Sequence, residues 1–166
     1  MSLERHLVAH LQETYTTERD YQGYLRDWSG HIRDQQLKAS INSEIHDIDG
    51  ELTNLAHCLN FFNESPSVDS QSPFVQALKQ EDQQTMQAMK ESGALDMDVH
   101  LAMTDTKFAN SEVANYQAML TMARVLHQSD VAKLLEDNLS HEENDLQTIQ
   151  DILLALIDLS QQQKAA

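Results

Sequence analysis

The chain contains too few glycines and prolines to fold into anything other than long helices. Its 166 residues include four glycines and two prolines, whereas a β-sandwich or β-barrel needs a tight turn about every ten residues. Between the few breaks, apolar residues recur at spacings of three and four, which is the periodicity of an amphipathic helix. The sequence therefore predicts an all-α protein, and its length suits a single domain over residues 1–166.

Breaks in this periodicity divide the chain into five expected helices. The strongest breaks lie between Asn63 and Pro73, where Pro, Ser and Asn cluster, and at Ser92-Gly93. The first two expected helices cover roughly 2–27 and 31–62. The third is about fifteen residues long and opens at Ser72-Pro73. The fourth covers roughly 95–127, and the fifth follows Asp130, which is its expected N-cap. The polar tail from about residue 160 is expected to fray.

The four long segments suit an antiparallel four-helix bundle. At 1.5 Å per residue each of them is about 40 Å long, which exceeds the usual helix of about three turns. The short third helix lies between the second and the fourth in the sequence. We therefore expect it to form the crossover connection of the bundle.

The charge balance of the chain excludes several classes of partner. Eleven Lys and Arg against 27 Asp and Glu give a formal charge of −16, which repels phosphate backbones and anionic lipids. No apolar run approaches the roughly 20 residues that span a bilayer. Glu4 and His6 interrupt the apolar start that a signal peptide needs, so a cytoplasmic protein is expected. The single cysteine, Cys58, excludes an internal disulfide and a zinc site built on cysteines.

Acidic residues fall on the apolar faces of all four long helices. Glu18, Glu112 and Glu142 lie within the apolar stripes of the first, fourth and fifth segments, and Glu44 lies at the edge of the second. A lone buried carboxylate costs several kcal/mol, but a divalent cation shared by several of them offsets that cost. The predicted metal ligands are Glu18, Glu44, Asp47, Glu112, Glu142 and Asp145.

Histidines give this prediction weaker support. Di-iron bundles usually contain two Glu-x-x-His pairs, and the sequence contains none. His46 and His141 neighbour the candidate carboxylates but point partly off the apolar stripes, so they are secondary candidates for metal ligands. Two interpretations stay open at this point: a carboxylate-rich metal site, or inward acids that pair with other groups or hold protons.

Four segments of the chain resemble the YciE/YciF-like branch of the ferritin-like superfamily. They are Tyr15-Thr-Thr-Glu-Arg-Asp20, Asp47-Ile-Asp-Gly-Glu-Leu52, Ser111-Glu-Val-Ala-Asn-Tyr116 and the stretch Leu134–Glu143. The resemblance extends over roughly residues 3–158. Its specificity lies in the order and spacing of the four segments, because no single one is diagnostic.

The resemblance implies a ferritin-like bundle with an extra helix, often a homodimer, linked to stress responses and without an established enzymatic activity. It also implies that Glu18, Glu112 and Glu142 are metal carboxylates. The chain departs from the family in three places. Glu44-x-x-Asp47 stands where the family tends to have His-x-x-Glu, and Ala109 replaces one carboxylate of the fourth helix. Asp145 lies one position before the family's acidic residue, which is Leu146 here.

Two main functional hypotheses follow. The first is a bundle that binds iron or manganese, with dioxygen or peroxide as a small-molecule reactant. The alternative is a metal-free homodimeric structural or interaction protein that has lost the site. An iron-storage cage is a weaker third hypothesis, because it needs a complete ferroxidase site.

Overall fold

Five helices make up the computed structural model, which describes residues 2–88 and 94–165. They are α1 (Leu3–Ser29), α2 (Gln35–Asn60), α3 (Pro73–Ala88), α4 (Ala94–Val125) and α5 (Ser129–Ala165). The described residues contain no β-strand, which confirms the predicted all-α class. No helix in these ranges combines the length and the apolar character needed to cross a membrane. The predicted break at Ser92-Gly93 lies outside the described residues.

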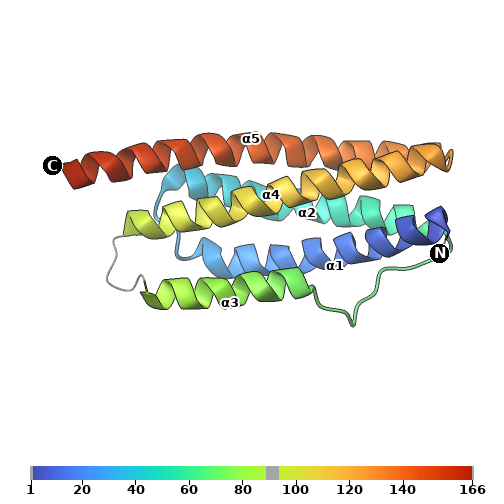
Figure 1. The fold of residues 1–166 in the computed structure, drawn as a ribbon, viewed down its shortest axis with the longest axis horizontal. Coiled ribbons are helices and arrows are strands. Elements are labelled where there is room, and N and C mark those ends of the chain that lie inside the picture. The colour runs from blue at the N-terminus through green and yellow to red at the C-terminus, as the bar shows by residue number, and fades with distance from the viewer. Residues whose placement is uncertain (1, 89–93, 166) are drawn as a thin grey trace.

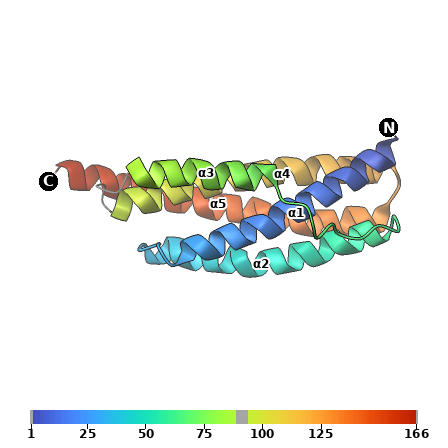
Figure 2. The ribbon, with the colours of Figure 1, turned by 90° about the horizontal axis from the view of Figure 1, so that it is seen from below.

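The four long helices lie side by side, and α3 runs along the outside of α1 (Figure 1). Helix α1 is antiparallel to α2, and α4 is antiparallel to α5. The connection after α2, together with α3, carries the chain back along the bundle, so α4 runs in the same direction as α2 (Figures 1 and 2). This is the predicted four-helix bundle, with the short third helix in the crossover.

Residues with left-handed backbone conformation end two of the long helices. Asn63 has φ 58° and His127 has φ 56°, and Asn is among the residues that adopt this conformation most readily. The amide after each of them bonds a carbonyl five residues earlier, as in a Schellman motif: Glu64 N to Leu59 O at 3.1 Å, and Gln128 N to Ala123 O at 2.9 Å.

The fifth helix differs from its prediction at both ends. It begins at Ser129, so Asp130 lies within the first turn instead of capping it. At the other end, the helix continues to Ala165, and the expected fraying from about residue 160 is wrong. Leu156 and Ser160 are both buried, so this part of α5 packs against the protein, and Gln, Lys and Ala continue a helix readily.

Helix α3 is attached to α1 through its first turn. Ser72 caps it, because the Ser72 hydroxyl accepts from Val75 N at 3.3 Å, and Pro73 occupies the first helical position. Ser72 also bonds α1 twice: its amide donates to Asp20 Oδ2 at 2.7 Å, and its hydroxyl lies 3.0 Å from Thr17 Oγ1. These bonds fix the start of α3 beside the middle of α1.

The apolar core consists of two clusters at different heights in the bundle. One contains Leu7, Leu11, Leu55, Leu59 and Met119, and the other contains Tyr21, Leu25, Leu37, Ile41 and Phe108, among others. Along each of the four long helices, buried acidic residues lie between these two groups. The next section describes this layer.

We expect Ser72→Ala to lower the free energy of unfolding by about 1 kcal/mol, because α3 loses its N-cap. The melting temperature should fall by about 2–4 °C. Urea unfolding followed by circular dichroism measures the change. Ser140→Ala is the control, because Ser140 is exposed on α5 and bonds a carbonyl of its own helix. Equal stability of the two variants would contradict the assigned cap.

Candidate metal centre

Three carboxylates from three helices meet in the interior of the bundle. Glu18 of α1, Glu51 of α2 and Glu142 of α5 each present an oxygen, and these oxygens lie within 4.8 Å of one another. All three side chains are buried, at 0%, 1% and 6% exposure. Glu112 of α4 is buried beside them and interacts electrostatically with Glu18. Each long helix therefore contributes one glutamate to this layer.

Several oxygens of these carboxylates have no hydrogen-bond partner in the described part of the chain. They are Glu18 Oε2, both oxygens of Glu51, and Glu112 Oε2. A buried polar atom without a partner costs roughly 1–3 kcal/mol, and more when the group is charged. Native proteins rarely contain such atoms unless a water molecule hydrogen-bonds to them or an ion binds them. These buried oxygens are therefore free to accept hydrogen bonds or to bind an ion.

A small polar network holds two of the carboxylates in place. Tyr116 of α4 donates its hydroxyl to Glu18 Oε1 at 3.0 Å. Asn138 of α5, which is fully buried, donates to the Tyr116 hydroxyl at 3.1 Å and to the Glu51 carbonyl at 3.2 Å. Asn54 completes the network by donating to Asn138 Oδ1 at 2.7 Å. These bonds link all four long helices at the height of the carboxylates.

Burial raises the pKa of every carboxylate in the layer. Desolvation raises the pKa of Glu18 to about 7, against the opposing effect of the Tyr116 hydrogen bond. Desolvation followed by repulsion from Glu18 raises the pKa of Glu51 to about 10. The same two causes raise the pKa values of Glu112 and Glu142 well above the usual range. Without a cation, the layer therefore holds protons at neutral pH.

Arginine does not neutralise these acids in the described residues. Arg19 pairs with Asp20 and with carbonyls of the connection before α3. Arg124 pairs with Glu136 on the surface. One basic side chain comes close: His141 Nδ1 lies 3.8 Å from Glu51 Oε1, beyond hydrogen-bond distance.

The donor set fits a divalent metal ion. Carboxylate oxygens are the ligands that manganese and other hard cations prefer, and iron binds them in bundle cores. Two oxygens on opposite sides of an ion at about 2.1 Å are about 4.2 Å apart. The three oxygens, within 4.8 Å of one another, therefore need only small side-chain rotations to share one ion.

Of the predicted ligands, Glu18 and Glu142 belong to the three-carboxylate group, and Glu112 lies next to it. Glu44 does not join them. It lies seven residues, or two helical turns, before Glu51, and it shares a hydrogen bond with Asp105. The member of the group from α2 is Glu51, which the sequence analysis did not select. Whether these residues bind metal stays a prediction.

A second polar layer lies about two turns along the bundle. Asp105 of α4 is buried and accepts a hydrogen bond of 2.5 Å from the Tyr21 hydroxyl. Desolvation raises the pKa of Asp105 to about 6, partly offset by its bonds to Tyr21 and Glu44. Desolvation and the charge of Asp105 raise the pKa of Glu44 well above its usual range.

The other predicted site residues lie nearer the surface. Asp145 and Asp47 are half-buried, and their mutual repulsion adds to the desolvation that raises the pKa of Asp145 to about 6. His46 is exposed. His141 has a side chain that is 56% exposed, although it lies close to Glu51.

The sequence contained the signal for Glu51. This residue lies three positions after the buried Ile48 and four before the buried Leu55, which is the relation that Glu142 has to Leu139 and Leu146. Glu44 occupies the same face of α2, because seven residues are close to two helical turns. The periodicity therefore identifies the face but not the height of the ligand.

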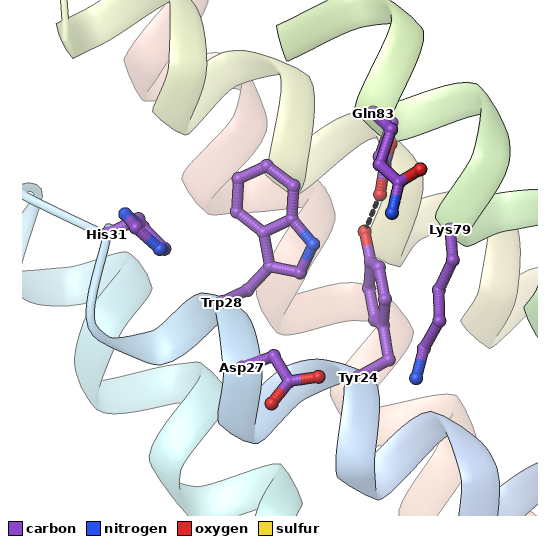
Figure 3. Close-up of a pocket in the computed structure, with 7 residues that line it drawn as sticks. Tyr24, Asp27, Trp28, His31, Lys79 and Gln83 are labelled. Carbon is purple, nitrogen blue, oxygen red and sulfur yellow. Dashed lines mark hydrogen bonds between the residues drawn. The ribbon is translucent and has the colours of Figure 1, made fainter.

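An aromatic pocket of about 200 Å³ lies at the end of α1 against α3 (Figure 3). Tyr24 and Trp28 form one wall, and Lys79 and Gln83 of α3 line the opposite side. The Tyr24 hydroxyl donates to Asp82, which also lies 2.7 Å from His100 Nε2. Tyr24 is six residues after Glu18, about 9 Å along the helix, and none of the four layer glutamates lines this pocket.

Comparison with known proteins agrees with this architecture. The family model described as "Domain of unknown function (DUF892)" matches residues 2–162. No curated protein matches the chain.

Three solved structures share the fold. They are YcfI from Rhodopseudomonas palustris (TM-score 0.83, 17% identity, 90% of this chain and 94% of that chain), the stress protein YciF from E. coli (0.82, 18%, 95% and 98%), and a protein from Xanthomonas campestris (0.77, 18%, 99% and 99%). These likenesses confirm the expected resemblance to YciF-like proteins. At such low identity they establish the fold alone.

In the metal-free protein, the free energy of unfolding is expected to fall as pH rises from about 5 to about 8. Unfolded glutamates lose their protons near pH 4.5, whereas folded Glu18 keeps its proton to about 7 and Glu51 to about 10. The folded state therefore binds more protons in this range, and stability is lost as pH rises. Each retained proton contributes a slope of about 1.4 kcal/mol per pH unit.

Chemical unfolding in the presence of a chelator, repeated across this pH range, measures the slope. Glu51→Gln should reduce it. Glu143→Gln is the matched control, because it makes the same Glu-to-Gln change at a residue that is exposed beside Glu142. A wild-type stability that stays constant or rises with pH would contradict the buried, protonated layer.

Proposed function

The chain belongs to the family described as "Domain of unknown function (DUF892)", and we propose that it is a metal-binding helical bundle. In this proposal, Glu18, Glu51 and Glu142 bind iron or manganese in the bundle core. Glu112 supplies a fourth carboxylate from α4. The ion replaces the protons that these groups otherwise hold.

One observation carries the proposal. Carboxylate oxygens without hydrogen-bond partners come from α1, α2 and α4, and among the described residues no Arg or Lys pairs with them; the one basic contact is His141, 3.8 Å from Glu51 Oε1. A protein that used these residues only for packing would be more stable with apolar side chains of similar volume. Free donor atoms in a dry core are the expected form of a carboxylate metal site before the ion enters.

The surrounding residues have distinct roles in this proposal. Tyr116 fixes one oxygen of Glu18 and leaves the other oxygen free. Asn138 holds α2 at the height of Glu51 through the Glu51 carbonyl. The two apolar clusters above and below the layer exclude water, which strengthens the attraction between carboxylates and a cation.

Iron or manganese suits this site because the donors are oxygen atoms. Carboxylate oxygens are typical ligands of manganese, and of iron in bundle cores, whereas copper and zinc sites more often contain nitrogen and sulfur ligands. When bound, such an ion supplies one-electron redox chemistry toward dioxygen or peroxide. The protein's own contribution is to hold the acids, exclude water and release their protons.

The physiological setting is also a proposal. The E. coli protein that shares the fold is titled a stress protein, and a response to oxidative stress would suit a redox-active ion in a protected core. We further propose a cytoplasmic homodimer as the working form of this chain.

The alternative function is that of a metal-free homodimeric structural or interaction protein. Protons then satisfy the layer, as the raised pKa values allow. The metal-binding and metal-free functions differ in whether the four glutamates bind an added metal ion.

Anaerobic incubation with Fe(II) or Mn(II), gel filtration and elemental analysis separate them. We expect about one ion or more per chain, as in carboxylate bundles. Glu51→Ala should lose most of the bound metal, because Glu51 is the member from α2 with both oxygens free. The control is Glu143→Gln, which changes the surface charge beside Glu142. This variant should retain the bound metal. Substoichiometric metal that is unchanged in Glu51→Ala and Glu112→Ala would favour the metal-free function.

A further inference from the structure

A second pocket reaches one of the layer glutamates from the surface. It encloses about 220 Å³ between α1 and α4, next to the start of α3. Its lining consists of His10, Glu13, Thr14, Thr17, Phe74, Ser111, Glu112 and Asn115. The lining is thus mostly polar, although it leads into the interior of a helical bundle.

Glu112 connects this pocket to the metal layer. It lines the pocket, yet it is only 1% exposed. Its Oε1 accepts from Asn115 Nδ2 at 3.2 Å, and its Oε2 has no partner in the described residues. Desolvation raises its pKa, and repulsion from Glu18 on the inner side and, more weakly, from Glu13 on the outer side adds to this effect. Glu112 therefore stands between the pocket and the three-carboxylate group.

The mouth of the pocket carries exposed groups that attract cations. Glu13 has a side chain that is 75% exposed, and His10 lies one turn before it, with Nδ1 3.8 Å from Glu13 Oε2. Deeper in the pocket, Thr14 and Thr17 are buried, and their hydroxyls contact Met119 Sδ and Ser72 Oγ. The pocket therefore has one carboxylate at its exposed mouth, Glu13, and one at its buried end, Glu112.

We propose that this pocket is the entry site for divalent cations, with Glu13 as the capturing group and Glu112 as the carboxylate that passes the ion to Glu18, Glu51 and Glu142. The inference rests on the proposed metal-binding function and adds a route to it. The alternative opening in Figure 3 is lined by aromatic rings, Lys79 and two aspartates, Asp27 and Asp82. It reaches none of the four glutamates.

The physical reason for a dedicated route is the closure of the layer. The side chains of the apolar clusters on either side offer few ligands to a dehydrating ion, and a bare divalent cation in apolar surroundings is strongly disfavoured. Carboxylates at both ends of the pocket would replace part of the water lost by the ion. The −16 charge of the chain raises the local concentration of cations but does not select an opening.

Stopped-flow mixing with Co(II), followed by its visible absorption, tests the route. Ser111→Phe fills the pocket from a half-buried position on α4. It should slow both association and dissociation by about tenfold or more, with the number of bound ions and the equilibrium affinity unchanged, because an obstructed route alters rates alone. Ser140→Phe, on the exposed side of α5, should bind as the wild type does.

Glu13→Gln provides an independent test that does not alter packing. It should slow association by about threefold at low salt, and the effect should vanish at high salt because the capturing charge is exposed. Glu143→Gln removes the same charge away from the pocket and should leave the rate unchanged.

The outcomes distinguish the route from the site. In one outcome the wild type binds Co(II) and Glu51→Gln abolishes the absorption, but Ser111→Phe and Ser140→Phe bind Co(II) at the same rate. This outcome would contradict the entry site and support the metal site. Equal rates for Glu13→Gln and Glu143→Gln at low salt would remove Glu13 as the capturing group. If the wild type shows no Co(II) absorption, the proposed function fails, and the entry site fails with it.

Discussion

Four glutamates share one buried layer, and the rest of the structure is arranged around the cost of placing them there. An uncompensated carboxylate in a protein interior is among the most destabilising groups a fold can contain. Here Glu18, Glu51, Glu112 and Glu142 lie together between two apolar clusters. Arginine pairs elsewhere in the described residues, and the one basic contact is the largely exposed His141, so protons or a metal ion are left to balance most of this charge.

In the proposed function, protons and metal compete for the same oxygens in this layer. The raised pKa values of Glu18 and Glu51 mean that the metal-free fold is held partly by bound protons. An ion must displace these protons to bind, so its affinity rises with pH, in the direction opposite to metal-free stability. Metal binding is therefore expected to stabilise the folded state most at higher pH, where the metal-free protein is less stable.

The second polar layer has a similar composition but a different arrangement. Tyr21 donates a hydrogen bond to Asp105, and Asp105 acts on Glu44. In the first layer, Glu18, Glu51 and Glu142 from three helices bring their oxygens within 4.8 Å of one another, and buried oxygens of Glu18, Glu51 and Glu112 have no partner among the described residues. This convergence is the reason for assigning the proposed metal to the first layer.

The fold class, the order of the helices and the inward direction of Glu18, Glu112 and Glu142 could be read from the sequence. All of these depend on helical periodicity, which is a local property. The choice between Glu44 and Glu51 was not local. Glu18 lies eleven residues before the end of α1 at Ser29, and Glu44 lies nine residues after the start of α2 at Gln35. Counting from the loop therefore favours Glu44 as the partner of Glu18.

The actual partner depends on the axial shift between the two helices, which the packing of the intervening loop and the other helices sets. The same limit applies to Asp105, whose role appears only when α4 is placed against Tyr21. The entry pocket is formed by α1, α3 and α4 together, so no single segment indicates it. The end of α5 was misjudged because polar composition suggested fraying, while tertiary burial of Leu156 and Ser160 extends the helix.

The number of protons released when Mn(II) binds tests the central claim most directly. Calorimetric titrations at pH 7 in buffers of different ionisation enthalpy measure it. A layer that holds protons in place of metal should release about one proton or more per ion, and Glu51→Gln should release fewer. Binding of Mn(II) without proton release would show that the carboxylates are already ionised, and would contradict the account.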